Sequence, residues 1–261
     1  MKKNNDLNFS KNSLKDNGLI FLSFPNTEFI KSLTKLLSPL KSKELMNLSS
    51  DEYRKQINLF QEKINNGNYM NIFMEMECDK LLKIINTKNI SVQSNLYLRA
   101  TRPKMTQHSE YIGWHRESMY SDHQSIKNAY NIWIPIFGVN QNNTLNFIPN
   151  SHTIPDNKLG IKKLNKQSKI KRFSDGHKIG LPYSPKVITN GVDFENKKKV
   201  LPPKNHYALF MSDLIHGGAE NNCEQIRVSI DFRIIDTKKN KSEKIHFSSG
   251  KKYFIEYHNV K

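Results

Sequence analysis

Two histidines and one glutamate in this chain have the residue types and spacing of metal ligands. His115 and Glu117 are two residues apart in the segment GWHRES, and His216 follows far downstream in LIHGG. On an extended segment, side chains two residues apart point to the same side. Two imidazoles and one carboxylate on one face of an octahedral ion form the facial triad typical of non-haem iron(II) sites. A chelating 2-oxo acid can fill two of the three open positions, and O2 the third.

A second pair of polar residues strengthens this interpretation. A histidine beside an acidic residue is common by chance in a chain with nine histidines, so a solvated or core histidine is the ordinary alternative. Arg227 and Ser229, however, follow His216 on a predicted strand, where their side chains point the same way. A guanidinium fork and a hydroxyl suit the distal carboxylate of 2-oxoglutarate. The metal-ligand group and the arginine–serine pair, in this order, indicate a 2-oxoglutarate-dependent iron site more specifically than any one of these residues does.

The elements that must position these residues are of two kinds. Up to residue 89, apolar residues recur at helical spacing and predict three packing helices: within 26–48, from Ser50 as N-cap, and over 71–85. From residue 90 the period changes to two, which indicates strands. We expect these strands at 91–101, 129–137, 144–148, 207–211 and 225–235. Helices followed by strands indicate an α+β, mainly β chain whose strands form a barrel or jelly roll.

Two basic segments lie outside the barrel core, which we place at 90–152 and 205–235 of a single domain with a helical N-terminal part at 1–89. The insertion 153–204 carries 13 Lys and Arg against 4 Asp and Glu, a net charge of +9. A loop of this length is usually a lid, a binding segment or disordered. Residues 236–261 are interpreted as a basic C-terminal extension.

Three longer motifs surround the candidate residues: WHRE, then NIWIPI with NNTLNFIPNSH, then LIHGGAEN with RVSIDFR. With them, residues 90–235 resemble the phytanoyl-CoA dioxygenase-like branch of Fe(II)/2-oxoglutarate-dependent oxygenases. YLRATRP and GWHRES more narrowly resemble oxygenases of bacterial surface-carbohydrate and aminoglycoside clusters. The resemblance implies a double-stranded β-helix (jelly-roll, cupin-like) core. It also implies a dioxygenase that hydroxylates or otherwise oxidises a small molecule, such as a sugar or sugar nucleotide. Desaturation, epimerisation or ring formation would use the same residues.

The resemblance implies a role for each matching residue. The three predicted ligands would hold Fe(II), and Arg227 would anchor the cosubstrate 2-oxoglutarate beside O2. Trp133 and Tyr97 match residues that line the cosubstrate pocket. By their places on the predicted strands, Asn131 and Thr144 are candidates for contact with the cosubstrate, with a structural role in the barrel as the alternative.

Two residues depart from the family pattern. Glu117 stands where most members have aspartate, and its extra methylene moves the carboxylate outward. Asn150 replaces the glycine of the turn before the final histidine of the IPNSH motif. Because asparagine tolerates the left-handed conformation, we expect this turn to be retained.

Further polar residues are candidates for contact with the substrate. Asn95, Arg99 and Arg102 suit a carboxylate or phosphate, with a surface or inter-strand ion pair as the alternative. His152 is expected to cap the turn in which it lies instead of binding metal. Three more residues flank the predicted site: His108, Asp122 and His123.

The net charge of +17 suggests an anionic partner. Lysine-rich solvated surface is the alternative explanation. The sequence has no zinc finger, no RNP-type aromatic motif and no clean recognition helix, which argues against nucleic acid as a partner. We therefore expect a small-molecule substrate, anionic and phosphorylated or nucleotide-linked, that the insertion 153–204 steers inward.

The remaining composition bears on compartment and redox state. No window approaches the roughly 18 apolar residues of a membrane helix, and the apolar run Leu19 to Phe24 is too short for a secretion signal. We therefore expect a cytoplasmic protein without a membrane partner. Cys78 and Cys223 form no CxxC pair, and we expect free thiols. Neither the substrate nor the oligomeric state follows from the sequence.

Two other classes of function compete with an oxygenase. A cupin-type metal-dependent isomerase or hydrolase could use the same three ligands with zinc or manganese, but would have no need of Arg227 and Ser229. A non-catalytic carbohydrate- or nucleic-acid-binding jelly roll would not need the triad. Conversion of 2-oxoglutarate to succinate and CO2 in the presence of iron distinguishes the three.

Overall fold

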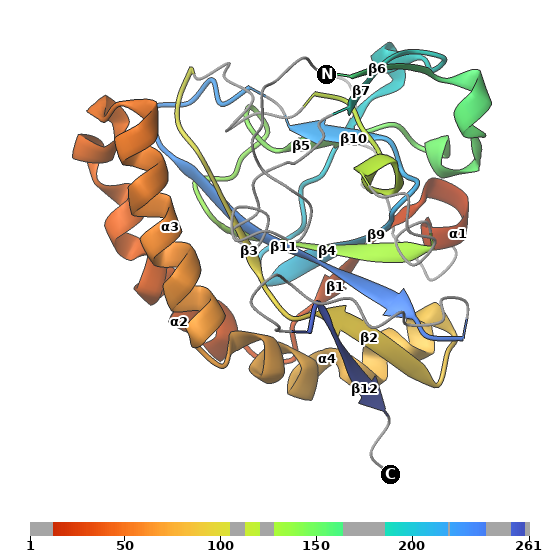
Figure 1. Cartoon of the computed structure of the whole chain (residues 1–261), viewed down its shortest axis with the longest axis horizontal. Coiled ribbons are helices and arrows are strands. Elements are labelled where there is room, and N and C mark those ends of the chain that lie inside the picture. The colour runs from red at the N-terminus through yellow and green to blue at the C-terminus, as the bar shows by residue number, and fades with distance from the viewer. Residues whose placement is uncertain are drawn as a thin grey trace.

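The structure, a computed structural model, describes residues 13–104, 113–120, 128–163, 186–218, 220–238 and 252–258. Its main element is a seven-stranded antiparallel sheet of order β1-β9-β4-β11-β2-β12, in which β3 also pairs with β11 (Figure 1). The strands are β1 (Leu19–Ser23), β2 (Asn89–Gln93), β3 (Tyr97–Thr101), β4 (Ala129–Phe137), β9 (His206–Met211), β11 (Arg227–Asp236) and β12 (Phe254–His258).

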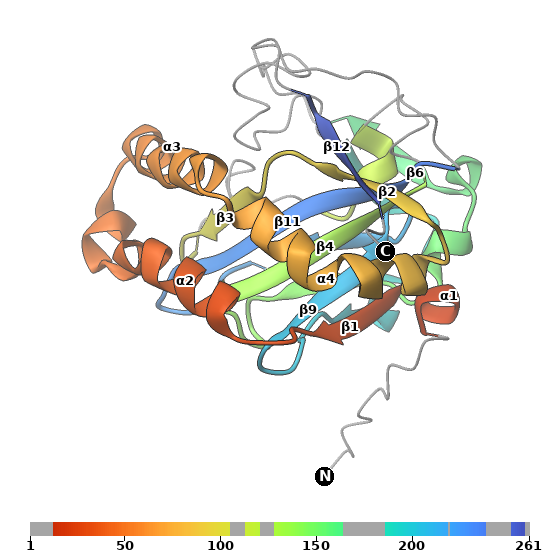
Figure 2. The same ribbon diagram turned by 90° about the horizontal axis from the view of Figure 1, so that it is seen from below.

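Three helices cover one face of this sheet (Figure 2): α2 (Glu28–Leu37), α3 (Ser50–Asn66) and α4 (Tyr69–Ile85). Their apolar residues form the main core together with even-numbered residues of β4 and β11, such as Ile132 and Ile230. Because side chains alternate along a strand, the odd-numbered residues of both strands face the other side. A short helix, α1 (Ser13–Asn17), precedes β1. None of the helices in the described ranges is both long and apolar enough to cross a membrane.

The predicted helix at 26–48 is interrupted. After α2 the chain continues as two 3-10 turns, Ser38–Lys41 and Lys43–Asn47, the first of which contains Pro39 near its start. Proline lacks the backbone N–H that an α-helix needs there. The N-cap of α3 is Ser49, not the predicted Ser50, because the Ser49 hydroxyl accepts from the backbone N–H of Glu52 and the Glu52 carboxylate accepts from that of Ser49.

A smaller antiparallel sheet lies on the side of the main sheet that the helices leave open. It has the order β10-β5-β8, with β5 (Leu145–Phe147), β8 (Lys198–Lys199) and β10 (His216–Gly218). A second apolar cluster joins the two sheets through residues such as Trp133, Phe147 and Phe210. The described strands, with a further pair β6 (Gly160–Lys163) and β7 (Lys186–Asn190), form open antiparallel sheets and do not close into a barrel.

The strand predicted at 91–101 is two strands. Between the pairs Asp231–Tyr97 and Ile234–Val92, β11 advances three residues and the opposite chain five. The Gln61 side chain of α3 compensates at this interruption, because it donates to the Leu96 carbonyl at 2.5 Å and accepts from the Leu98 N–H at 2.7 Å. A helix side chain thus replaces hydrogen bonds that the sheet cannot supply.

We expect Gln61→Ala to lower the free energy of unfolding by about 2–4 kcal/mol, because it leaves two buried backbone groups without partners. Urea denaturation measures this loss. Gln56→Ala, at an exposed position of the same helix, is the matched control and should change stability by less than about 0.5 kcal/mol. Equal effects of the two substitutions would contradict the bracing role of Gln61.

Candidate metal centre and adjoining cavity

The two histidines of the predicted triad lie side by side because the chain segments that carry them pair. The backbone N–H of His115 donates to the His216 carbonyl at 2.9 Å, and that of His216 donates to the His115 carbonyl at 3.0 Å. Gly217 permits this approach: a Cβ there would lie 3.2 Å from the carbonyl carbon and oxygen of Gly113. The glycine of the HGG motif therefore brings two distant segments together.

Backbone carbonyls fix the orientation of both imidazoles. The Nδ1 atom of His115 lies 2.7 Å from the Gly113 carbonyl, and that of His216 lies 2.9 Å from the Leu214 carbonyl. With the proton on Nδ1, each ring presents the lone pair of Nε2 to the cavity. Burial lowers the pKa of His216 to about 4, and burial together with His216 lowers that of His115 well below its usual value. Neutral imidazoles are the form that binds metal.

Glu117, predicted on a strand or its extended edge, completes the group from a different element. It opens a 3-10 turn, Glu117–Tyr120, and its Oε1 atom lies 3.5 Å from the Nε2 atoms of both His115 and His216. All three ligand atoms lie within 4.8 Å of one another. Arg233, which the sequence analysis missed, donates to the other carboxylate oxygen, Oε2. Arg233 therefore leaves one glutamate oxygen facing the two imidazoles.

The second predicted pair lies on the same face of β11. Arg227 is buried and donates to the Asn143 carbonyl at 2.5 Å and to the Thr101 hydroxyl at 3.0 Å. Burial, and then the charge of Arg99, lower the pKa of Arg227 to about 10. Within the described residues, Arg227 Nε and Ser229 Oγ are buried without a hydrogen-bond partner. A buried donor pair of this kind is costly unless something binds to it.

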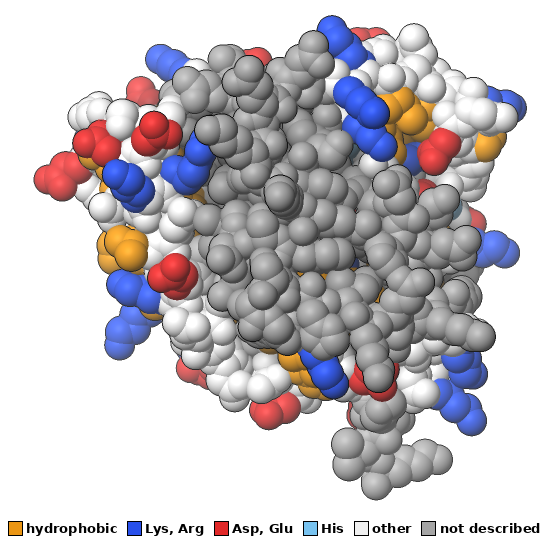
Figure 3. Space-filling model, viewed as in Figure 1, with side chains coloured by type: hydrophobic (Ala, Val, Ile, Leu, Met, Phe, Trp, Pro, Cys, Tyr) orange, Lys and Arg blue, Asp and Glu red, His pale blue; other side chains and the backbone are white. Residues whose placement is uncertain are grey.

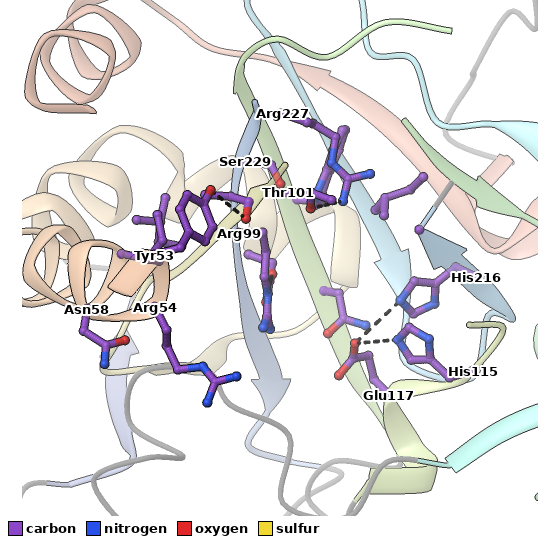
Figure 4. A pocket seen from close by; sticks show the side chains of 18 of the residues that line it. Tyr53, Arg54, Asn58, Arg99, Thr101, His115, Glu117, His216, Arg227 and Ser229 are labelled. Carbon is purple, nitrogen blue, oxygen red and sulfur yellow. Dashed lines mark hydrogen bonds and ion pairs between the residues drawn. The ribbon is translucent and has the colours of Figure 1, made fainter. Parts of the chain in front are cut away.

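One cavity of about 140 Å³ connects the metal-ligand group with this pair. Figure 4 shows His115, Glu117 and His216 on one side and Arg227 and Ser229 farther along β11. The amide nitrogen of Asn131 is a third buried polar atom without a partner in the described part of the chain. The cavity wall is made of residues from both sheets and from α3: Ser50, Tyr53, Arg54, Ile57, Asn58, Leu98, Arg99, Ala100, Thr101, His115, Glu117, Asn131, Trp133, Leu145, Phe210, His216, Gly218, Arg227, Ser229 and Asp231.

The cavity does not include two of the predicted cosubstrate residues. Tyr97 is buried on β3, with the Arg99 guanidinium carbon 5.8 Å from its ring centre, and does not line the cavity. Thr144 lies outside it as well, because its hydroxyl donates to the Val200 carbonyl. Asn131 and Trp133, by contrast, do line the cavity.

The candidates for substrate contact also separate. Arg99 lines the cavity but is paired with Asp231, at 2.5 and 3.1 Å. Arg102 is buried and donates to the Leu48 carbonyl at 2.6 Å. His152 lies 3.0 Å from the Lys15 carbonyl, away from the triad, and Asn95 is buried outside the cavity. His108, Asp122 and His123 lie outside the described residues.

The sequence did not predict three features of this site: Asp231, Arg233 and the cavity wall formed by α3. Asp231 and Arg233 belong to the alternation that begins with Arg227 and Ser229, so continuing the pattern along β11 would have indicated them. The wall formed by α3 had no such signal, because the face that a helix turns to a cavity depends on tertiary packing. Helix α3 packs on the sheet as expected, through residues such as Tyr53 and Phe60, and in addition lines the cavity.

The described residues fit a metal with a dicarboxylate beside it. Two neutral imidazoles and one carboxylate oxygen converge, which is the donor set of a facial triad. Along the same cavity lies a buried cation whose Nε has no partner among the described residues, next to a hydroxyl in the same state. One group supplies metal ligands and the other a place for a carboxylate.

Comparison with known proteins finds similarity in structure alone. No protein-family model and no curated protein matches the chain. Among solved structures, the non-heme monooxygenase ThoJ in its apo form has a TM-score of 0.58 at 12% identity, over 87% of this chain and 77% of that one. EctD from S. alaskensis, with 2-oxoglutarate and 5-hydroxyectoine, has a TM-score of 0.56 at 14% identity, over 91% and 80%. EvdO2 from Micromonospora carbonacea var. aurantiaca, with 2-oxoglutarate, has 0.55 at 11%, over 86% and 89%. The chain shares the fold of these proteins.

Proposed function

We propose that this protein is a non-haem Fe(II)- and 2-oxoglutarate-dependent dioxygenase that oxidises a C–H bond of a small molecule. The observation that carries the proposal is one cavity that holds both a His-Glu-His group and a buried arginine–hydroxyl pair without partners in the described residues. Two of the similar structures contain 2-oxoglutarate, which agrees with this reading. In this proposal the two facing sheets would be the two halves of a double-stranded β-helix.

In this proposal each residue of the triad has a defined task. His115 and His216 bind the metal through Nε2, and the backbone carbonyls at their Nδ1 atoms keep them in the correct tautomer. Glu117 binds through Oε1, while Arg233 holds Oε2. When bound, iron supplies the oxidation, in which 2-oxoglutarate, O2 and a substrate C–H bond give succinate, CO2 and a C–OH group.

The arginine pair would bind the cosubstrate. Arg227 is held in place by the Asn143 carbonyl and the Thr101 hydroxyl, so its guanidinium is already oriented for the distal carboxylate of 2-oxoglutarate. Ser229 adds a hydroxyl on the same strand face. Asn131 pairs with Arg233 of β11 and so lies nearer the triad, where its amide would be a donor at the metal end of the cosubstrate. Trp133, nearly fully buried, lines the cavity opposite Asp231 of β11 and helps to exclude water from it.

The substrate is proposed to be a small molecule, with a sugar or other natural-product scaffold as the class that the sequence motifs favour. The structure of EctD contains a small hydroxylated molecule, 5-hydroxyectoine, which is in keeping with this size. The branch of the family, the phytanoyl-CoA dioxygenase-like one, stays a proposal based on the motifs alone.

Anaerobic thermal unfolding tests the proposal without requiring the substrate. Fe(II) should raise the melting temperature, and 2-oxoglutarate should raise it further only when metal is present. At one hundred times its dissociation constant, a ligand adds about 2.7 kcal/mol of stability. Glutarate, which lacks the 2-oxo group, is the matched control and should add less. Stabilisation by 2-oxoglutarate that ignores the metal would contradict a chelating cosubstrate.

A further inference from the structure

Helix α3 provides a wall of the cavity that the proposed cosubstrate does not use. Arg54 and Asn58 lie four residues apart and therefore share one face of the helix, and both line the cavity. Figure 4 shows Arg54 pointing from α3 toward the side where His115, Glu117 and His216 lie. This wall is separate from the strand that carries Arg227.

The wall is fixed in position. The Tyr53 hydroxyl, next to Arg54 in the chain, donates to the Ala100 carbonyl of β3 at 3.2 Å. The guanidinium carbon of Arg102 lies 4.3 Å from the centre of the Tyr53 ring, and Arg102 also donates to the Leu48 carbonyl just before the helix. Farther along, Gln61 bonds to the Leu96 carbonyl. A helix tied to β3 at several points can present Arg54 to a ligand with little loss of entropy on binding.

Among the described residues that line the cavity, none serves as a counter-ion for Arg54. Five charged residues in the described part of the chain line it: Arg54, Arg99, Glu117, Arg227 and Asp231. Arg99 is paired with Asp231, Glu117 belongs to the triad with Arg233, and Arg227 is assigned to 2-oxoglutarate. Arg54, half-buried, makes no hydrogen bond or ion pair with the described residues. A divalent iron and a dianionic cosubstrate cancel one another, so the excess positive charge of the cavity is unchanged when both bind.

Arg54 is not part of a general basic surface. On α3 the exposed charged residues are of both signs, three acidic and two basic: Asp51, Glu52, Lys55, Glu62 and Lys63. Figure 3 shows acidic and basic side chains interspersed at the edge of the molecule where α3 lies. Among the described residues of α3, Arg54 is therefore the one that brings positive charge to the cavity.

We propose that Arg54, with Asn58 one turn away, binds an oxoanion group of the substrate: a carboxylate, sulfate or phosphate. The proposal rests on the proposed function, because it assigns the other cavity residues to iron and 2-oxoglutarate. It names a specificity-determining residue that the sequence reading did not include. The anion holds the substrate at the α3 wall while the rest of the molecule extends toward the triad.

The test uses protein loaded with Zn(II) and 2-oxoglutarate. Sulfate, methyl phosphate and acetate are titrated in turn at constant ionic strength, and the side-chain Nε–H signal of Arg54 is followed by NMR. At least one of the three anions should bind saturably, and comparison of their affinities identifies the class. Arg54→Ala should weaken binding of that anion by about tenfold or more, measured by calorimetry, because a charged hydrogen-bond partner is lost. Arg54→Lys should retain part of the affinity.

Lys55→Ala is the matched control, since it removes the same charge from an exposed site on the same helix, and it should leave anion affinity unchanged. Equal losses in Lys55→Ala and Arg54→Ala, or no saturable anion binding by the wild-type protein, would overturn the proposal. Weaker binding of 2-oxoglutarate by Arg54→Ala, with anion affinity intact, would overturn it too and place Arg54 in the cosubstrate site. Anion binding that depends on Arg54 in a protein that binds no 2-oxoglutarate would support the anion site while removing the proposed oxygenase function.

Discussion

Replacing His216 by alanine is expected to abolish iron-dependent turnover and to weaken metal binding by more than about 100-fold. His216 supplies one of only three protein ligands, and no other His, Cys, Asp or Glu in the described residues joins this group. The fold should persist, because alanine retains the backbone hydrogen bonds that pair this segment with His115 and the two sheets have apolar cores of their own. Metal titration, succinate assay and thermal unfolding measure the three outcomes.

His206→Ala is the matched control for that variant. His206 lies at the start of β9, where its ring is 2.9 Å from the Lys204 carbonyl, outside the cavity. The His206→Ala protein should bind metal as tightly as the wild-type protein does. A His216→Ala protein that keeps full activity would remove the triad from the account, whereas one that fails to fold would shift the test to His115→Ala.

The second large effect concerns Arg227. Arg227→Ala should raise the concentration of 2-oxoglutarate needed for half-maximal binding by about 30-fold to a few thousand-fold, because a buried carboxylate that loses its charged partner costs about 2–5 kcal/mol. Arg227→Lys should recover only part of this, since an ammonium cannot form the guanidinium fork. Ser229→Ala removes a neutral donor and should cost less, about 0.5–1.5 kcal/mol.

Metal affinity is the internal control in this series, because neither residue is a ligand and neither contacts one in the described structure. The loss of 2-oxoglutarate affinity should therefore be largest in Arg227→Ala, smaller in Arg227→Lys and smallest in Ser229→Ala. The affinity for iron should be the same in all three variants. If titration with 2-oxoglutarate is unchanged in Arg227→Ala, the anchor lies elsewhere. Arg99 would be the next candidate, although it is already engaged by Asp231.

The sequence predicted the central strands well because they depend on local patterns of alternation. The strand expected at 129–137 is β4 with the same bounds, and the one expected at 225–235 is β11 within two residues. In both, alternation placed the functional residues on one face. Asn150 adopts the left-handed conformation with φ 62° as expected. The three candidate metal ligands could be named from the sequence because their residue types and spacing indicate metal binding without knowledge of the fold.

What the sequence did not predict depends on contacts between distant segments. The break between β2 and β3 exists because Gln61 of α3 satisfies the backbone there, and no local pattern of 91–101 indicates it. β12, within the segment taken for an extension, joins the sheet by pairing with β2. β1 is a short apolar run that is recognisable as a strand only through its partner β9. The cavity wall on α3 is the functional consequence of the same kind of contact.

That the positive charge of the insertion 153–204 steers an anionic substrate to the site stays a prediction. Lys162 and Lys163 lie on the exposed strand β6, but Lys169, Lys171 and Arg172 are outside the described residues. Steering by this segment requires second-order capture of an anionic substrate to fall steeply with ionic strength. Arg54 is proposed to raise the affinity for an anion inside the cavity. The loss of affinity in Arg54→Ala should therefore persist at high salt, where steering by the insertion is screened.

Succinate formation tests the central claim most directly. Protein loaded anaerobically with Fe(II) and 2-oxoglutarate is exposed to O2 without added substrate, and succinate and CO2 are quantified against bound iron. The account predicts succinate and CO2 in equal amounts, both dependent on Fe(II) and O2, and neither formed by His216→Ala. A wild-type protein that demonstrably holds Fe(II) and 2-oxoglutarate, yet releases no succinate on exposure to O2, would contradict it.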